Sequence, residues 1–243
     1  MKKRSIWFLG IFTAGLALAE APTDISPPPP LWDLKSEATF LWTTGNTSVT
    51  TLGLGLETNY RPDPWAYRLR GAFLTSTNTG TQSAERLDVV GRAERSLTPS
   101  IGVYLQSAYF KNRFAGFNDR MGVEVGGLFG LLPPGKQSLG AEVGVGFIRE
   151  NRTTLPSQDF ASGRVGLKYE CDLKEDLKFT AGLSFLSNFM NLADWRLNNT
   201  EALTMEINKV FALRVAFGLD FLNVPVAAQK LDTSTTVSLV ATL

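Results

Sequence analysis

The chain has 243 residues, with 24 lysine and arginine residues against 23 aspartate and glutamate residues, one cysteine and no histidine. This length fits one domain, and the even charge balance argues against nucleic acid as a partner. A single cysteine excludes an intrachain disulfide. The missing histidine excludes Ser–His and Cys–His nucleophile pairs and imidazole zinc sites. Catalysis by carboxylates alone stays open, but nothing in the sequence singles out a pair, so we expect no enzyme, no metal and no cofactor.

The first 30 residues have the features of an export signal followed by a spacer. Three basic residues at 2–4 precede an apolar run of 13 residues at 6–18, and Ala17-Leu18-Ala19 supplies a small-x-small cleavage pattern. The alternative, a membrane-anchor helix, needs ~20 apolar residues. We predict a cleaved signal peptide at 1–19, a proline-rich linker at 20–30 and one domain at 31–243.

From residue 31 onward, apolar and polar residues alternate with a period of two, which is the pattern of β-strands. At the start of this region, Trp32, Leu34 and Trp42 fall on one face, and Asp33 and Glu37 fall on the other. The alternation predicts about twelve strands, at 32–42, 51–60, 65–73, 86–94, 103–109, 120–129, 138–147, 164–170, 177–185, 203–207, 213–221 and 231–243. A tilted transmembrane strand needs ~9–11 residues, and most of these segments are long enough.

The connections favour a barrel with two different ends. Short connections are expected at 61–64, 98–100, 133–136, 173–176 and around 210, and longer ones at 78–83, 111–118, 151–158, 190–196 and 223–230, with a tight first hairpin at 45–46. Outer-membrane barrels have short periplasmic turns and longer outer loops. We therefore predict an all-β, antiparallel, up-and-down transmembrane barrel with both termini in the periplasm. The alternative is a soluble β-sandwich or lipocalin-like barrel.

The polar face of this barrel is expected to line its lumen. The lumen-lining candidates are Glu57, Arg68, Arg70, Arg86, Asp88, Arg92, Arg120, Glu124, Glu142, Arg164, Arg214 and Asp220. Arg68 and Arg70 occupy successive inward positions and could form an anion-attracting patch, with Glu57 and Asp88 as their expected partners. Two interpretations stay open: a pore lined by opposed charges, or salt bridges that fill the lumen.

Three short motifs carry a family resemblance. They are the Thr-Thr-Gly-Asn-Thr-Ser turn at 43–48, the Gly-Gly-Leu-Phe-Gly-Leu-Leu strand end at 126–132, and Lys-Leu-Asp at 230–232. Together they resemble the YdiY-like salt-induced outer-membrane protein family, a β-barrel family whose domain has no assigned function. The resemblance covers roughly 31–243, with one departure, since the chain ends on Leu243 and not on an aromatic residue.

The resemblance sharpens location and leaves the activity open. It implies a barrel in the outer membrane, with outer-membrane lipid and the barrel-assembly machinery as partners. The first functional hypothesis is a narrow channel for small solutes or ions, linked to salt or osmotic conditions. The alternative is a closed structural barrel without transport activity, which reinforces the envelope or presents loops to partners.

Overall fold

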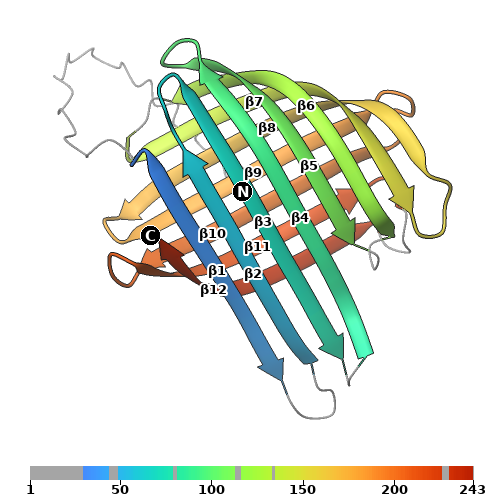
Figure 1. Cartoon of the computed structure of the whole chain (residues 1–243), viewed down its shortest axis with the longest axis horizontal. Helices are drawn as coiled ribbons and strands as arrows, with labels where there is room; N and C mark the ends of the chain where they lie inside the picture. Colours follow the sequence, from blue (N-terminus) through green and yellow to red (C-terminus); the bar gives the residue numbers. More distant parts are fainter. Residues whose placement is uncertain are drawn as a thin grey trace, which may run out of the picture.

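A computed structural model describes residues 30–43, 49–78, 81–112, 116–132, 135–225 and 230–242. Within them the chain forms one closed barrel in which every strand pairs antiparallel with its neighbours in sequence, and β1 pairs with β12 (Figure 1). The strands are β1 (Trp32–Thr43), β2 (Val49–Tyr60), β3 (Trp65–Asn78), β4 (Thr81–Ser96), β5 (Ile101–Asn112), β6 (Phe117–Leu132), β7 (Gln137–Arg152), β8 (Gln158–Lys174), β9 (Leu177–Asn188), β10 (Trp195–Glu206), β11 (Phe211–Leu222) and β12 (Leu231–Thr242). The predicted all-β, antiparallel barrel of twelve strands is confirmed.

Several expectations fall outside these residues. The predicted signal peptide, nearly all of the proline-rich linker, the 45–46 hairpin and Leu243 lie beyond the part of the chain that the structure describes. In that described part, no helix is long and apolar enough to cross a membrane.

The two faces of the wall differ sharply in chemistry. Outward-facing apolar side chains stay exposed on every side, as in Leu54, Leu105, Val125, Val145, Val215 and Val237. Charged side chains alternate with them and face the interior, because successive residues of a strand point to opposite faces. An apolar outside around a charged inside is the reverse of a soluble barrel and is typical of a barrel that spans a membrane.

Aromatic side chains stack near both ends of the strands. On one end, Trp32 lies 4.4 Å from Tyr60, which lies 6.2 Å from Tyr67, measured between ring centroids. On the other end, the rings of Trp195 and Phe221 are 5.0 Å apart. Aromatic girdles at both membrane interfaces are expected for such a barrel, and these rings suit that position.

The connections define a turn side and a loop side of the barrel. The turn side carries 61–64, 97–100, 133–136, 175–176 and 207–210, and the loop side carries the other connections. One prediction was wrong: a long connection was expected at 78–83, but only residues 79–80 separate β3 from β4. The two strands stay paired up to Asn78 and Thr81, past a register shift at Ser76/Thr77, so strand pairing replaces the loop.

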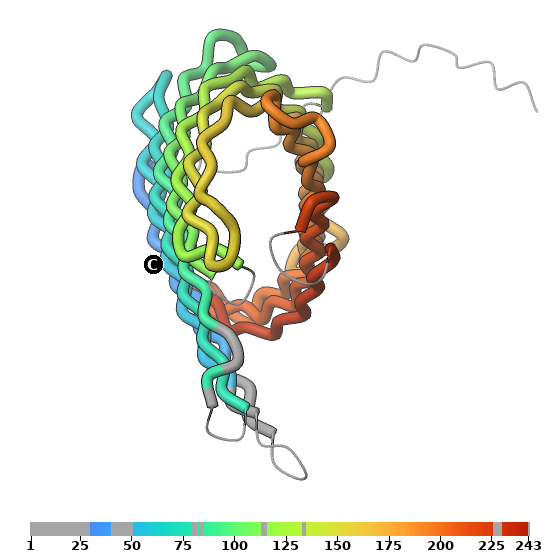
Figure 2. The backbone as a smooth tube through the Cα atoms, turned by 90° about the vertical axis from the view of Figure 1, so that its right-hand side faces the viewer, coloured from blue at the N-terminus to red at the C-terminus, as the bar shows by residue number. Residues whose placement is uncertain are grey.

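Strands also reach further than the alternation indicated. β10 begins at Trp195, inside the segment 190–196 that was expected to be a loop, because Trp195 and Arg196 pair with Ser187 and Leu186 of β9. The wall closes around an oval interior (Figure 2). The longer strands therefore place additional charged side chains at the loop-side mouth of the lumen.

Candidate functional site

A chain of ion pairs runs along the lumen face of β4 to β8. Glu142 of β7 accepts from Arg92 Nη2 at 2.8 Å and from Arg164 Nη2 at 2.7 Å. Arg164 Nε also donates to Glu124 at 2.8 Å, and Arg92 Nε to Glu94 at 2.6 Å. The five side chains form one network of alternating charge, which we call the central network.

Tyr104 of β5 packs into this network. Its hydroxyl donates to Glu124 and accepts from Arg164 Nη2 at 3.0 Å, and the Arg92 guanidinium lies 4.1 Å from its ring centroid. Space for this ring comes from glycine, since a Cβ on Gly144 would meet the Tyr104 hydroxyl and Glu124 Oε1, the latter at 2.9 Å. Because Gly144 has no side chain, Tyr104 and Glu124 can approach the wall at this point of β7.

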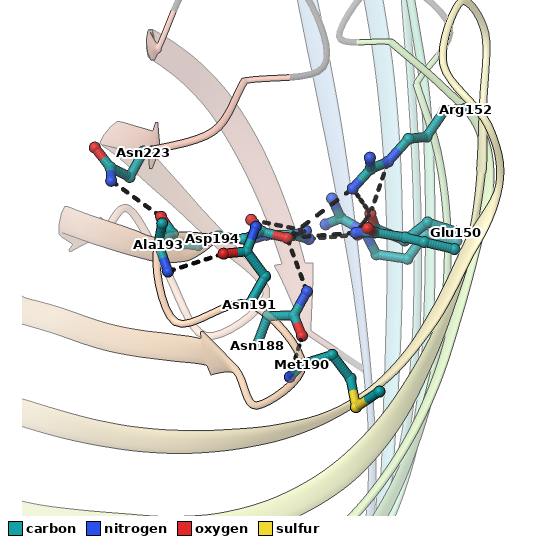
Figure 3. Close-up of polar contacts among 11 residues, drawn as sticks. Glu150, Arg152, Asn188, Met190, Asn191, Ala193, Asp194 and Asn223 are labelled. Atoms are coloured by element: carbon teal, nitrogen blue, oxygen red, sulfur yellow. Dashed lines mark hydrogen bonds and ion pairs between the residues drawn. The ribbon is translucent and has the colours of Figure 1, made fainter.

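A second cluster gathers at the loop-side mouth around Glu150 of β7, which is fully buried (Figure 3). Its carboxylate pairs with Arg196, with Arg120 Nε at 2.7 Å and with Arg152 Nη2 at 3.1 Å. Asp194 pairs with Arg196 at 3.2 Å. Three guanidinium groups therefore share two carboxylates, and the cluster carries a net positive charge.

The connection between β9 and β10 is tied into this cluster through Asp194. Asp194 Oδ2 accepts from Asn188 at 3.1 Å (Figure 3). It also accepts from Gln158 at 3.3 Å. A backbone hydrogen bond closes the same turn, in which the Asp194 N–H donates to the Asn191 carbonyl at 2.8 Å. Burial acts to raise the pKa of Asp194, but the charge and hydrogen bonds of Arg196 and its amide partners outweigh burial and hold it below its usual range.

One ion pair crosses the lumen. Arg86 of β4 lies 3.7 Å from Asp220 of β11, measured from Nη1 to Oδ2, and its Nε lies 2.6 Å from Asp88. Asp220 is directly opposite Asp232 in the pairing of β11 with β12. Asp220 therefore faces Arg86 from the opposite wall, and Asp232 lies beside Asp220 on β12.

Two cavities lie on either side of the central network. The loop-side cavity has a volume of about 580 Å³, and both Glu124 and Arg164 line it. The turn-side cavity has a volume of about 260 Å³, and Glu94, Glu142 and Lys168 line it. The central network lies between these cavities and is therefore the candidate constriction of the lumen, on its β4 to β8 side.

The structure gathers some of the twelve candidates and separates others. Five of them line the loop-side cavity: Arg86, Arg120, Glu124, Arg164 and Asp220. Arg92 and Glu142 belong to the central network, and Asp88 binds Arg86. Arg214 pairs with Glu37 at 3.1 Å, beside the closure between β1 and β12.

Arg68 and Arg70 stand apart from these clusters. Arg68 Nε donates to Asn59 at 3.0 Å, and Arg70 is directly opposite Glu57 in the pairing of β2 with β3. The expected partnership of these arginines with Asp88 was wrong, because Asp88 binds Arg86 two residues away on the same face of β4.

Of the cluster at the loop-side mouth, which we call the mouth cluster, only Arg120 is among the twelve candidates. Glu150 has the same parity on β7 as Glu142, so continuing the alternation past 147 would have found it. Arg196 and Asp194 were assigned to a loop, and Asp232 was read only as part of the last alternating segment. No group of three or more acidic or cysteine side chains in the described part of the chain is placed to hold a metal ion.

Comparisons with known proteins agree with the sequence resemblance. Residues 36–243 match the family described as "Protein of unknown function, DUF481". The chain is 26% identical over 204 residues to the Uncharacterized protein YdiY of Escherichia coli (strain K12), which covers 83% of this chain and 79% of that protein. The resemblance to a YdiY-like family is confirmed.

Solved structures share the fold at low sequence identity. The COG4313 outer membrane channel from Pseudomonas putida F1 superposes with a TM-score of 0.53 at 10% identity, over 93% of this chain and all of that one. The translocator domain of the autotransporter NalP from Neisseria meningitidis gives a TM-score of 0.50 at 11% identity, over 89% of each chain. At these identities the likeness concerns the barrel fold alone.

Proposed function

This chain belongs to the DUF481 family of proteins of unknown function, and we propose that it is an outer-membrane β-barrel that forms a narrow channel for small solutes or ions. The observation that carries the proposal is the pair of cavities on either side of the central network. A lumen filled by side chains would leave no such space, whereas a channel needs a vestibule on each side of its constriction.

Exposed charges inside the wall support the same proposal. Lys168 keeps 58% of its side chain exposed and Arg86 keeps 42%, although both face the lumen. Water therefore reaches them from within, which desolvated ion pairs of a filled core would not allow. A wet lumen with charges of both signs suits small polar or charged solutes.

The location follows from the outer surface and from the resemblance. The apolar band suits outer-membrane lipid, and export through the signal peptide at 1–19 would deliver the chain to the barrel-assembly machinery. The COG4313 protein is an outer membrane channel of the same fold class. A link to salt or osmotic conditions rests on the resemblance alone, and the protein's cellular level at low and high salt tests it.

A closed structural barrel is the second candidate, and the constriction favours it. Arg92 exposes only 7% of its side chain and Arg164 only 16%, so the two arginines of the central network are largely desolvated. Such a barrel would reinforce the envelope or present loops to partners without conducting.

Single-channel recording separates the two candidates. Protein extracted from membranes in detergent is inserted into a planar bilayer, and we expect steady conductance that rises when Arg164→Ala widens the constriction. Arg149→Ala is the control, because Arg149 lies on the outer surface with 63% of its side chain exposed. Silent bilayers, with heat-modifiable electrophoretic migration confirming a folded barrel, would overturn the channel and leave the closed barrel.

A further inference from the structure

The loop-side cavity has walls of opposite charge. Arg120 and Arg196 line it from β6 and β10, and Asp220 and Asp232 line it from β11 and β12. In the closed order of strands, β6 and β12 are six steps apart in a wall of twelve, which puts Arg120 and Asp232 on opposite sides of the lumen. Arg196 starts from β10, beside β11, but its guanidinium reaches Glu150 of β7 on the side of Arg120. A solute in the cavity therefore lies between a basic wall and an acidic wall.

The basic wall is incompletely neutralised. Arg120, Arg152 and Arg196 share the carboxylates of Glu150 and Asp194, which leaves one positive charge in excess. Among the described residues, Arg120 Nε and Nη2 have no hydrogen-bond acceptor. Nε lies 2.7 Å from Glu150, but its N–H does not point at the carboxylate oxygen. An anionic group near Arg120 would offset this excess.

The acidic wall has the opposite imbalance. Asp220 and Asp232 are directly opposite each other on adjacent strands, an arrangement in which like charges repel. Arg86 lies nearer to Asp88, at 2.6 Å, than to Asp220, at 3.7 Å. Asp232 has no ion-pair or hydrogen-bond partner among the described residues, so a cationic group between the two aspartates would be stabilised.

The cavity also has an apolar lining, which comes from β5, β6, β7 and β9. Phe110, Phe117, Ile148 and Leu186 all line the cavity, and the Arg120 guanidinium sits 4.0 Å from the Phe117 ring centroid. Ligand sites of this kind usually combine apolar lining with a few converging polar groups in ~300–1,000 Å³. The volume of about 580 Å³ is within that range.

We propose that this cavity selects small zwitterions, whose carboxylate faces Arg120 and Arg196 while the ammonium group faces Asp220 and Asp232. A simple anion would meet the aspartates, a simple cation would meet the arginines, and a neutral polyol would gain from neither wall. Only a solute that carries both charges, such as a free α-amino acid, complements both walls at once. This selection rests on the proposed channel function.

Osmotic swelling of proteoliposomes tests the proposal with L-serine as the zwitterion and erythritol as a neutral solute of similar size. We expect L-serine to enter about fivefold faster than erythritol, the effect of one screened ion pair worth ~1 kcal/mol. The double variant Asp220→Asn, Asp232→Asn is expected to lower the ratio of the L-serine rate to the erythritol rate to about one. Asp159→Asn is the matched control, because Asp159 lies on the outer surface and binds Arg149.

The outcomes separate the two levels of the proposal. Equal wild-type rates for L-serine and erythritol would overturn zwitterion selection and leave the channel standing. If neither solute enters vesicles that contain folded barrels, the channel itself is wrong. Calorimetric titration of the detergent-solubilised barrel with L-serine then tests the binding site without requiring transport. Binding heat that is present in the wild type and absent in the double variant supports the site. Absence of binding heat in the wild type overturns it.

Discussion

Arg86 and Asp220 meet across the lumen at 3.7 Å, although β4 and β11 are five steps apart around the wall, through β3, β2, β1 and β12. Strands so distant in the sheet can bring side chains together only where the interior is narrow. The oval outline of the barrel agrees with this (Figure 2). The pair therefore marks a narrow point at which charge affects whatever passes.

Removing Arg86 should make the channel more selective for cations. Arg86→Ala leaves Asp88 and Asp220 without the arginine that they share, and Asp232 lies beside Asp220, so the local charge becomes more negative. We expect the reversal potential in a KCl gradient to shift toward that of potassium. Because Arg86 is 42% exposed, the free energy of unfolding should change by less than about 1 kcal/mol.

The control for this change is Arg149→Ala, which removes an arginine from the outer surface. It should leave the reversal potential where it is in the wild type. An equal shift in both variants, or a shift toward chloride in Arg86→Ala, contradicts the assignment of Arg86 to the conduction path.

Glu142 should be the most sensitive carboxylate of the central network. Glu142→Gln removes the negative charge shared by Arg92 and Arg164, whose side chains are only 7% and 16% exposed. Arg92 keeps Glu94 and Arg164 keeps Glu124, but both guanidinium groups lose the charged acceptor that they share, and we expect a loss of about 1–3 kcal/mol. Urea unfolding in lipid vesicles measures it, and Asp159→Asn on the exposed surface pair should cost less than about 0.5 kcal/mol.

The alternation of residues was enough to find the twelve strands and the inward face. It places Glu124 and Arg164 on the lumen side because parity alone decides which face a strand residue occupies. The alternation does not predict which inward residues contact one another. Contacts across the lumen depend on the stagger of the strands and on the cross-section of the barrel. The Arg86–Asp220 contact between strands five steps apart was therefore out of reach.

Strand ends were the second gap. The sequence at 190–196 contains polar residues that suit a loop, yet Trp195 and Arg196 pair with β9. Their pairing is stabilised by a tertiary contact, the ion pair of Arg196 with Glu150. The alternation of residues along one strand carries no information about such a contact. The mouth cluster and its excess positive charge could therefore not be predicted from it.

Gly144 should tolerate no side chain, whereas Gly182 should. A Cβ at Gly144 would collide with the Tyr104 hydroxyl and with Glu124, but at Gly182 it would meet only a backbone oxygen at 4.0 Å. We expect Gly144→Ala to destabilise the barrel by about 1–3 kcal/mol, the usual cost of overpacking. Gly182→Ala should be neutral or slightly stabilising, because glycine weakens a strand interior.

Unfolding by urea in vesicles compares the two glycine variants directly, since both positions face the lumen from long strands. Conductance gives a second measure, because displacement of Tyr104 and Glu124 should alter the constriction in Gly144→Ala alone. Equal stability of the two variants would show that Tyr104 can move aside without cost and that the glycine has no packing role.

The tie between Asp194 and the mouth cluster should weaken in acid. Asp194 is buried, and Arg196 with its amide partners holds its pKa below the usual 3.8 in the folded protein. A carboxyl whose folded pKa is depressed stabilises the fold fully above its unfolded pKa and loses that contribution as pH falls through the folded value. The stabilisation should therefore be complete at neutral pH and decline below about pH 4.

Comparison with Asp194→Asn isolates this group from the other carboxylates, which titrate in both proteins. We expect the variant to be less stable by about 1–3 kcal/mol at neutral pH, and the difference to shrink as pH falls below about 4. Proteolysis within the connection 189–194 should follow the same course, with faster cleavage of the wild type in acid. A stability difference that stays constant across this range would mean that Asp194 acts through its shape and amide contacts and not through its charge.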